Sequence, residues 1–346
     1  MRVVAGIDLG GTAINYTLLD ERGHFLIEQL CEHPARTKEG PLICLQQMAD
    51  GLKIALEKAE LKPSDVVMAG LDTPGPASAA GVLSTRGGTN FVHADWAGWD
   101  FPGNLSKKLG IPVIYLNDGN AAALWGHFSL FGAGSGNSSI SAIIGTGLGG
   151  GVIVGDSVIQ GKNGFGGELG HVMIPWQSIP GTEGMNPVCN CGRPGDIESL
   201  CSLTAIERTL LPHFLAQNRS HELNRAETPH QAAKLVRGLA ERGDSLCMEV
   251  FRIQARALGL FFDQMINIFD PDALTIGGGG LETKPEFQQW FLREVRAGMP
   301  MQREEQANIP IHVMPNGDTA GARGAAIEAL AVAKRNNLLA MEIAGI

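Results

Sequence analysis

The sequence predicts an α/β protein of two lobes with a cleft between them. The chain has 346 residues, which is long for a single domain and sufficient for two. Apolar, β-branched runs alternate with segments of helical periodicity, as in α/β folds. The order strand, glycine-rich turn, strand occurs at Gly10 and again at Gly145. We infer an approximate internal duplication in which each lobe opens with a hairpin of the size that holds a phosphate group.

The first half of the chain supplies the elements of one lobe. Its strands are predicted from apolar runs that end at turn residues, and Asp20-Glu21-Arg22-Gly23 is a hairpin signal after the second of them. Its helices are predicted from apolar residues at helical spacing and from a run rich in alanine. The predicted strands are 3–9, 13–19, 25–31, 66–71 and 113–116, and the predicted helices are 42–59 and 120–130.

The second half repeats the meander and then becomes helical. A strand at 140–144 leads into the glycine-rich run 145–151, and 152–158 continues the hairpin. The stretch 175–196 is rich in Pro, Gly and Asn, which predicts a loop. The remaining predicted elements are helices over 204–268 and 321–339 and an inner strand at 274–276. The expected lobes are residues 1–117 plus about 322–346, and residues 118–321.

Composition and charge exclude several classes of protein. The net charge is −9 and the pI is about 5.5, which gives no electrostatic footprint for nucleic acid or an anionic membrane. No apolar run approaches the roughly 18 residues that cross a bilayer. Met1 leads almost directly into a strand-like segment, without the layout of a signal peptide. We therefore expect a cytoplasmic protein with reduced cysteines and with no nucleic-acid or membrane partner.

The 46 glycines gather directly after strand-like runs, where a backbone approaches a ligand or needs positive φ. Bare N–H groups at Gly10 and Gly11 can cup phosphate oxygens, and Asp8 could hold Mg²⁺ through water. The alternative is an ordinary two-glycine hairpin. The design recurs in the second lobe, and a third glycine turn offers adenine and ribose a flat backbone surface. The nucleotide-binding candidates are Asp8, Gly10, Gly11, Thr12, Gly145, Thr146, Gly147, Gly277, Gly278 and Gly279.

Asp118 is the candidate general base. It follows Asn117 at the end of a predicted strand, where a carboxylate beside a cleft can accept the proton of an alcohol during phosphoryl transfer. The alternative is that Asp118 caps the helix that follows. Glu168, His171 and Glu198 carry the carboxylate and imidazole groups that bind sugar hydroxyls. Each of these three, taken singly, is better explained as a surface carboxylate or as a histidine with a structural partner.

A metal site is predicted near the middle of the chain. His171, Cys189 and Cys191 offer three soft ligands for zinc, and a structural zinc site needs a fourth. Asp196 and Cys201 are the nearby candidates for that fourth ligand. The alternative is a reduced loop that binds no metal.

Together these motifs resemble the ROK family of repressors, open reading frames and sugar kinases, and in particular its bacterial glucokinase-like members. The resemblance covers nearly the whole chain, and the segment 144–171 looks like a complete family signature with its internal spacings kept. The matching motifs are Asp8-Leu9-Gly10-Gly11-Thr12, Pro74-Gly75-Pro76, Thr89-Asn90, Asn117-Asp118-Gly119-Asn120-Ala121-Ala122-Ala123, Gly145-Thr146-Gly147-Leu148-Gly149, Gly166-Gly167-Glu168-Leu169-Gly170-His171, Cys189-Asn190-Cys191-Gly192-Arg193-Pro194-Gly195, Gly277-Gly278-Gly279 and Asp318-Thr319-Ala320-Gly321.

The resemblance implies an actin-like (RNase H-like) ATPase fold, with ATP in the cleft and closure of the lobes around a sugar. It implies that Asp118 is the base, and that His171 places one ring nitrogen on zinc and the other toward the sugar. Family members are often dimers or tetramers, so we expect a homodimer or homotetramer. The implied sugar contacts are Gly75, Asn90, Asn117, Glu168, His171 and Glu198.

Some positions depart from the family pattern. Asp196 stands where the zinc motif usually has a cysteine, and carboxylate oxygen is itself a zinc ligand. Ala13 follows the threonine of the first hairpin, where many members have a lysine. Arg86-Gly87-Gly88 replaces a proline-rich form, which leaves the sugar preference open.

The leading hypothesis is a glucokinase, an ATP-dependent hexose kinase that phosphorylates O6 of glucose, with Mg²⁺ as cofactor and a structural Zn²⁺. The first alternative is a kinase for N-acetylmannosamine, fructose, mannose or allose. A second is a sugar-sensing repressor, which in this family carries an extra helix-turn-helix domain that we do not expect before the first strand here. A third is an ATPase on the same fold, which the sugar-contact set disfavours. The sugar, the phosphate donor, the oligomer and any regulation stay open.

Overall fold

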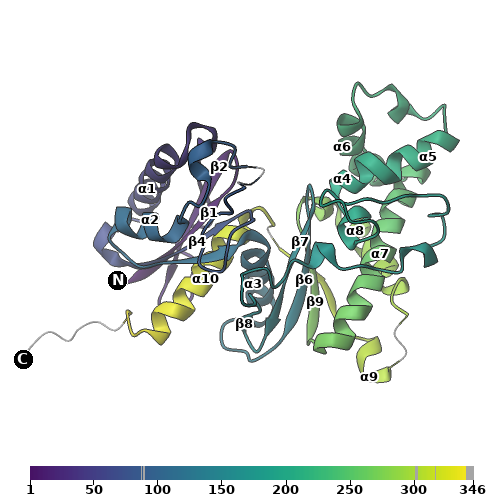
Figure 1. Ribbon diagram of the computed structural model, residues 1–346. Coiled ribbons are helices and arrows are strands. Elements are labelled where there is room, and N and C mark those ends of the chain that lie inside the picture. The colour runs from purple at the N-terminus through teal and green to yellow at the C-terminus, as the bar shows by residue number, and fades with distance from the viewer. Residues whose placement is uncertain (87, 89, 301–302, 316, 340–346) are drawn as a thin grey trace, which may run out of the picture. The chain divides into compact units, whose positions relative to one another are not determined.

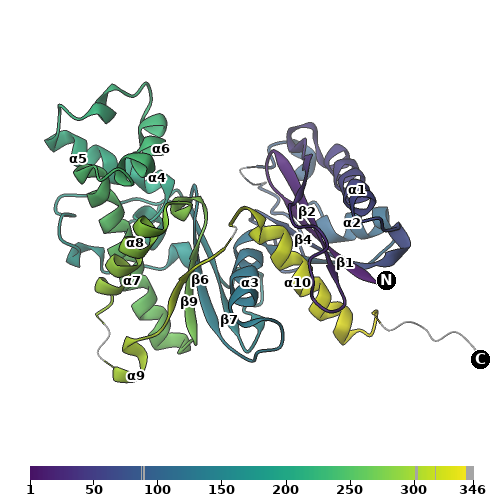
Figure 2. The ribbon, with the colours of Figure 1, turned by 180° about the vertical axis from the view of Figure 1, so that it is seen from behind.

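The computed structural model describes residues 1–86, 88, 90–300, 303–315 and 317–339 (Figure 1, seen from behind in Figure 2). Gly87 and Thr89, which belong to two of the sequence motifs, lie outside the described residues. The chain forms two compact units. The first comprises Met1–Ser135, Asp156–Gly167 and the chain from Asp318 onward, and the second comprises Gly136–Gly155 and Glu168–Gly317.

The first unit is an α/β layer structure. Its elements are β1 (Val3–Leu9), β2 (Ala13–Asp20), β3 (Cys31–Pro34), α1 (Pro41–Lys58), β4 (Val66–Thr73), α2 (Phe101–Leu109), β5 (Val113–Asn117), α3 (Asp118–Phe131) and α10 (Ala320–Arg335). The sheet has the order β3-β2-β1-β4-β5, with an antiparallel meander on one side and parallel β1, β4 and β5 on the other. Helices α1 and α2 cover one face, and α10 covers the opposite face (Figures 1 and 2).

The second unit and its sheet repeat this plan. The elements of the unit are β6 (Ser139–Ile144), β7 (Leu148–Val154), α4 (Leu203–Ala205), α5 (Leu211–Gln217), α6 (Pro229–Ala240), α7 (Ser245–Phe269), β9 (Ala273–Gly277), α8 (Pro285–Ala297), α9 (Glu304–Ala307) and β10 (Ile311–Val313). The sheet also includes β8 (Ser157–Val158), which belongs to the segment Asp156–Gly167. The sheet order is β10-β9-β6-β7-β8, with β6 antiparallel to β7 and with β6, β9 and β10 parallel. Taken from the other edge, this is the order of the first sheet, as the duplicated sequence pattern predicts.

Alternation along β1 explains how α10 reaches the sheet. Ile7, Leu9 and the other odd-numbered residues join the core under α1, so the even-numbered residues face α10. A Cβ atom at Gly6 or at Gly70 of β4 would overlap a carbonyl oxygen of α10. Glycine at both positions therefore lets the helix backbone lie directly on the sheet backbone.

The first unit extends beyond the expected lobe boundary. The sequence places this boundary between Asn117 and Asp118, but α3 packs along α10 and so belongs to the first compact unit. The segment Asp156–Gly167 also returns to this unit, where the Ala79 N–H donates to the Asn163 carbonyl at 3.1 Å. Which segments move together as lobes stays a prediction.

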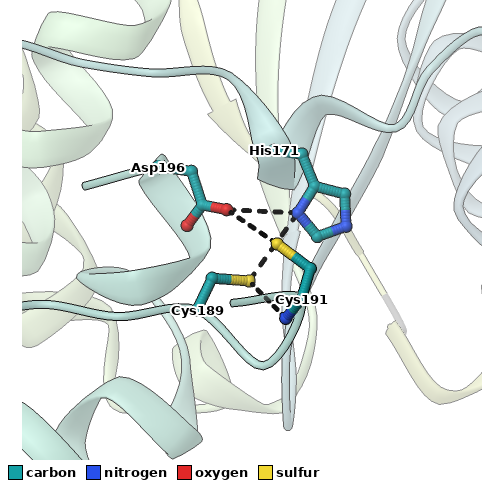
Figure 3. Close-up of side chains that lie close together, drawn as sticks. All are labelled: His171, Cys189, Cys191 and Asp196. Atoms are coloured by element: carbon teal, nitrogen blue, oxygen red, sulfur yellow. Dashed lines mark hydrogen bonds and ion pairs between the residues drawn. The ribbon is translucent and has the colours of Figure 1, made fainter. Parts of the chain in front are cut away.

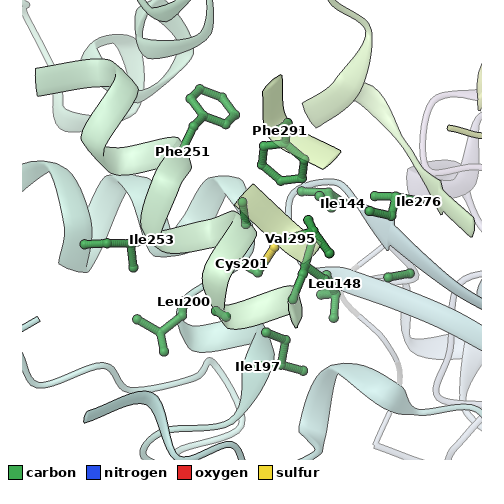
Figure 4. Packing of buried hydrophobic residues seen from close by; sticks show 14 of the residues in the cluster. Ile144, Leu148, Ile197, Leu200, Cys201, Phe251, Ile253, Ile276, Phe291 and Val295 are labelled. Carbon is green, nitrogen blue, oxygen red and sulfur yellow. The ribbon is translucent and has the colours of Figure 1, made fainter. Parts of the chain in front are cut away.

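The core of the second unit forms around α7, a helix of 25 residues. Buried aromatic and aliphatic side chains of α7 and α8 meet residues such as Ile144 and Ile276 from the sheet (Figure 4). Burying an aliphatic or aromatic side chain of this size stabilises a fold by about 1.5–3 kcal/mol. Within the described part of the chain, no helix combines the length and the apolar character that a membrane span requires.

The predicted third strand of the first meander is wrong. The pairing strand is β3, which takes only Cys31 from the stretch 25–31, and the rest of that stretch contributes an isolated bridge between Leu19 and Phe25. The reason is that Phe25 packs away from the ladder, with its ring centroid 5.6 Å from that of Trp125 and 4.9 Å from the guanidinium carbon of Arg323. Phe25 of this stretch therefore packs against helices α3 and α10.

The glycine-rich run 145–151 is only partly a turn. Strand β7 begins at Leu148, so the turn is limited to 145–147 and the next three glycines pair with β6. A Cβ at Gly150 would overlap the Ser141 carbonyl oxygen, and Leu169 packs over the same glycine. These strand glycines therefore permit close packing, while the turn glycines shape the hairpin.

Candidate functional site

The carboxyl ends of three parallel strands bring polar groups together in the first unit. Asp8 of β1 lies opposite Asp72 of β4, and Thr73 lies opposite Asn117 at the end of β5. Asp118 follows immediately. Since the carboxyl ends of parallel strands share one edge of a sheet, this is where open α/β sheets bind ligands.

Asp118 is exposed and is the first residue of α3. The N-cap of α3 is Asn117, whose Oδ1 accepts the Gly119 N–H at 2.9 Å. Asp118 Oδ1 accepts the same N–H at 2.8 Å. The capping position predicted as an alternative for Asp118 thus belongs to its neighbour, and the carboxylate lies at the solvent-facing N-terminus of the helix.

The first glycine hairpin lies against a predicted sugar contact. Its turn is closed by the Gly10 N–H, which donates to the Ala13 carbonyl at 2.9 Å, and by Thr37 Oγ1, which donates to the Gly11 carbonyl at 2.8 Å. A Cβ at Gly11 would lie 2.9 Å from Asn90 Oδ1. The structure therefore brings Gly11 and Asn90 together in the same unit.

Gly75 and Asn117 form a second close pair. A Cβ at Gly75 would lie 3.7 Å from Asn117 Nδ2, so a side chain at this position would fill the space beside the amide. Because Asn117 Oδ1 is used by the helix cap, Nδ2 is the group of this side chain that faces Gly75. The glycine leaves room beside an amide donor.

Asp72 was not anticipated from the sequence. It is fully buried, and among the described residues no N–H or O–H group donates to either of its carboxyl oxygens. Burial, with added repulsion from Asp8 and Asp118, raises the pKa of Asp72 well above its usual range. Burial also raises the pKa of Asp8, although hydrogen bonds with Asn15 and Asp72 oppose the rise. Burial therefore favours the protonated form of Asp72, which can share its proton with Asp8.

The second hairpin is braced by Glu198. Its turn closes through the Gly145 N–H, which donates to the Gly147 carbonyl at 2.9 Å. Glu198 Oε2 accepts the Leu148 N–H at 2.9 Å, and a Cβ at Gly147 would lie 2.5 Å from the same oxygen. Glu198 Oε1 accepts from the Cys189 thiol at 3.1 Å. This predicted sugar contact thus links the hairpin to the predicted zinc loop.

Glu168 and His171 lie in the same electrostatic neighbourhood as Glu198. Desolvation raises the pKa of Glu168, His171 opposes the rise and Glu198 adds to it. His171 stands at the end of a short 3₁₀ turn (Leu169–His171) that directly follows Glu168. The second unit therefore groups the three sugar-contact candidates that the sequence assigns to it.

The four predicted zinc ligands come together (Figure 3). His171 Nδ1 lies 3.2 Å from Asp196 Oδ2 and 3.7 Å from Cys189 Sγ, and Cys191 Sγ lies 3.7 Å from the same Asp196 oxygen. Tetrahedral zinc with bonds of about 2.0–2.3 Å keeps its ligand atoms about 3.3–3.8 Å apart, so these separations fit such a site. In Figure 3 the second ring nitrogen of His171 is directed away from the cluster.

The structure separates the two candidates for the fourth ligand. Asp196 Oδ1 caps the turn Ile197–Ser199 by accepting the Ser199 N–H at 3.0 Å, which leaves Oδ2 facing His171 and Cys191. Cys201 is fully buried in the hydrophobic core instead (Figure 4), and burial raises the pKa of its thiol. Only Asp196 is placed to complete the cluster.

A cavity of about 420 Å³ opens beside the second hairpin, within the second unit. Gly145, Thr146, Gly279 and Gly280 contribute to its lining. Two of the predicted adenosine glycines, Gly277 and Gly278, are outside the lining. Gly277 packs against Met314, and Gly278 has a φ of 90°, where a side chain would also meet the Ile144 carbonyl. The glycine turn thus contributes its later residues to the cavity.

Comparison with known proteins identifies the family. The model of the ROK family matches residues 4–332. The chain belongs to the ROK family. A glucokinase of Halalkalibacterium halodurans is 32% identical to it over 285 residues, which cover 80% of each chain.

Solved ROK structures share its architecture. The ROK hexokinase from Thermus thermophilus has a TM-score of 0.75 at 29% identity, covering 96% of this chain and 100% of that one. A ROK family glucokinase from Streptomyces griseus in complex with glucose and AMPPNP has a TM-score of 0.69 at 26% identity, covering 94% and 99%. ROK sugar kinases have the actin-like ATPase fold, so the predicted fold class is confirmed.

Proposed function

We propose that this ROK protein is an ATP-dependent hexose kinase whose acceptor is O6 of glucose. Relatives named glucokinase and the S. griseus complex with glucose and AMPPNP support a sugar kinase. The observation that carries the proposal is Asp118, an exposed carboxylate at the end of β5 whose neighbour Asn117 supplies the helix N-cap. A carboxylate so placed can accept the proton of the attacking sugar hydroxyl.

The hairpins would hold the triphosphate with backbone donors. Because the N–H groups of Gly10 and Gly145 are bonded within their own turns, the donors to phosphate would be the following N–H groups, at Gly11, Thr12 and Thr146. Phosphoryl transfer gains mainly from such alignment and from neutralisation of the developing charge. The proposed sugar contacts Gly75, Asn90 and Asn117 of the first unit, and Glu168, His171 and Glu198 of the second, would orient the acceptor.

Mg²⁺ would neutralise charge on the phosphates when bound. Asp8 is the candidate to hold it through water, because its carboxyl group is kept in place by Asn15 Nδ2 at 3.2 Å. Burial raises the pKa of Asp8, and a divalent cation nearby would favour the carboxylate form.

Zn²⁺ would be structural and held by His171, Cys189, Cys191 and Asp196. Burial and the carboxylates of Glu198 and Asp196 raise the pKa of the Cys189 thiol, so a cation is needed to stabilise the thiolate. When bound, zinc would fix the orientation of the His171 ring through Nδ1 and leave Nε2 for the sugar.

Elemental analysis tests the metal site. We expect about one zinc per chain, and its loss in Cys189→Ser and in Asp196→Ala because each removes a ligand. Cys201→Ala is the matched control, since it removes a buried thiol of the core and should leave the zinc content unchanged. Loss of zinc in Cys201→Ala with retention in Asp196→Ala would reverse the assignment. Folded, active protein without metal would refute the site.

A coupled assay of ADP release over about a dozen sugars tests the acceptor. Glucose should give the highest kcat/KM. Much slower turnover of glucose than of an N-acetylated sugar would replace the glucokinase assignment with the alternative of another hexose, such as N-acetylmannosamine, fructose, mannose or allose. Repeating the assay with polyphosphate or ADP in place of ATP tests the donor, and light scattering tests the expected homodimer or homotetramer.

Repressors are the second candidate class. A putative xylose repressor of Caldicellulosiruptor is 26% identical over 302 residues, which cover 69% of its length. The net charge of −9 disfavours binding of DNA by this chain. Sequence-specific retention on a DNA fragment, together with absence of sugar phosphorylation, would favour the repressor.

A further inference from the structure

The cavity beside the second hairpin contains a buried polar side chain with no role in the scheme above. Its walls are largely apolar, with Ile206, Ala233 and Phe251 almost completely buried. Gln254 lies about one turn after Phe251 on α7, lines the same cavity and is only 1% exposed. A buried amide in an apolar wall is costly unless both of its ends have partners.

Only one end of the Gln254 amide has a partner in the protein. Its Nε2 donates to the Ser202 carbonyl at 3.1 Å, and that oxygen also accepts the Ile206 N–H at 3.1 Å. Because a carbonyl can only accept, this contact determines which end of the amide is the nitrogen. In the described part of the chain this is the one hydrogen bond of the Gln254 side chain, so no donor reaches Oε1. The free acceptor therefore belongs to a side chain on the cavity wall.

The surroundings suit a nucleotide whose base enters this cavity. Gly145 and Thr146 of the phosphate hairpin form one part of the lining, and the glycine turn at Gly279 forms another. The guanidinium group of Arg237 donates to the Gly279 carbonyl and so ties α6 to that turn. Lys234 also lines the cavity and is exposed, so it places a positive charge near solvent. Phosphates at the hairpin would leave the base among the apolar walls.

We propose that Gln254 Oε1 accepts a hydrogen bond from the 6-amino group of adenine, which makes Gln254 a specificity-determining residue for the nucleotide. The inference rests on the proposed function, because it assigns the adenosine part of ATP to this cavity. Adenine presents a donor at its 6-position, whereas a 6-oxo purine presents an acceptor and unsubstituted purine presents no polar group there. A lone acceptor held in an apolar wall distinguishes these three bases.

Three nucleotides test the inference: ATP, purine riboside triphosphate, which lacks only the amino group, and ITP, which replaces it with oxygen. The wild-type protein should use ATP with a kcat/KM about 10–100-fold above that for purine riboside triphosphate, and should use ITP no better. Gln254→Met keeps the length of the side chain and removes the acceptor. In this variant ATP and purine riboside triphosphate should differ by less than about threefold.

Lys234→Met is the matched control. It removes a group of the same cavity that interacts by charge, so it should lower kcat/KM for all three nucleotides by the same factor and leave their ratio unchanged. Equal use of ATP and purine riboside triphosphate by the wild-type protein would overturn the inference, and so would a full preference for ATP in folded Gln254→Met. If that variant fails to fold, the wild-type ratio decides.

Failure of the Gln254 inference can be distinguished from failure of the kinase assignment. If no sugar is phosphorylated with any nucleotide, the kinase assignment fails. Displacement of a fluorescent methylanthraniloyl derivative of ATP from the wild-type protein then replaces the kinetic assay. Stronger displacement by ATP than by purine riboside triphosphate, by about tenfold or more, would support Gln254 as the base-selecting residue, and equal displacement would overturn it.

Discussion

The strand that enters the first hairpin carries Asp8 opposite Asp72, whereas the equivalent positions of the second unit are Ile143 and Gly277. Each is the last pair in the register of two parallel strands, and the two sheets have the same strand order. In the first unit the next parallel strand leads into Asp118, and in the second it leads into Met314 and Pro315.

This difference indicates that the two similar units have different chemical roles. The two sheets hold similar glycine hairpins, but the carboxyl groups lie at the strand ends of the first unit alone, among the residues compared. The second unit places a carboxylate on its hairpin from outside the sheet, through Glu198. The first unit is therefore expected to supply proton transfer and cation binding, and the second to supply backbone donors, the base cavity and sugar contacts.

The largest expected effect concerns Asp118. Asp118→Asn should lower kcat by about 10²–10⁴-fold and leave the KM for sugar near normal, because the variant loses a general base and keeps the shape of the side chain. Thermal unfolding should change little, since Asn117 caps α3. Steady-state kinetics on the best acceptor sugar provides the measurement.

Asp100→Asn is the control for this variant. Asp100 caps α2 by accepting the Gly103 N–H at 2.9 Å, and asparagine caps helices equally well. Its kcat should match that of the wild-type protein. If Asp118→Asn behaves in the same way, Asp118 is a helix-terminal residue, and the contrast between the two units loses its catalytic meaning.

A smaller effect compares the hairpins directly. Gly147→Ala should lower the free energy of unfolding by about 1–3 kcal/mol, because the new Cβ would lie 2.5 Å from a Glu198 oxygen that the Leu148 N–H holds in place. Gly11→Ala should cost less than about 0.5 kcal/mol, because the neighbouring Asn90 side chain is exposed and can turn away. Urea denaturation of both variants measures the difference. Equal losses would show that the two hairpins are braced alike.

The smallest effect concerns pH. The native pKa of Asp72 is raised, so the native state keeps a proton that the unfolded chain releases above about pH 4. Stability from this group is therefore full at low pH and is lost as pH rises toward the native pKa. Asp72→Asn lacks this loss, so its stability relative to that of the wild-type protein should rise as pH increases from 5 to 8.

Thermal melts of both proteins across that pH range provide the test for Asp72. Parallel stability profiles would mean that Asp72 is ionised in the native state. The first unit would then hold a buried negative charge at Asp72, where the second unit has Gly277.

Periodicity and turn residues predicted most elements, because buried strands such as β4 and amphipathic helices such as α1 leave strong patterns. The strand expected at 25–31 was misplaced because the aromatic ring of Phe25 has two partners far along the chain, Trp125 and Arg323. Contacts with residues so distant in the chain cannot be recognised from the local sequence pattern around Phe25.

The site shows the same limit. The ligands of the predicted zinc cluster, including Asp196, are close in sequence and are recognisable from residue type. The role of Asp72 depends on the parallel register that puts it beside Asp8, which the sequence does not specify. The role of Gln254 likewise depends on the cavity that α7 lines. A signal was present in both cases: a carboxylate at the end of a buried strand, and an amide on the buried side of a long helix.

The glycine contacts of α10 have a consequence for biosynthesis. The sheet of the first unit leaves the ribosome before the second unit, whereas the helix that covers Gly6 and Gly70 is translated after it. One face of that sheet must stay open to water or to chaperones until then, while most of the second unit, Glu168–Gly317, is already complete. The first unit is thus expected to begin synthesis before the second unit and to complete its fold after it.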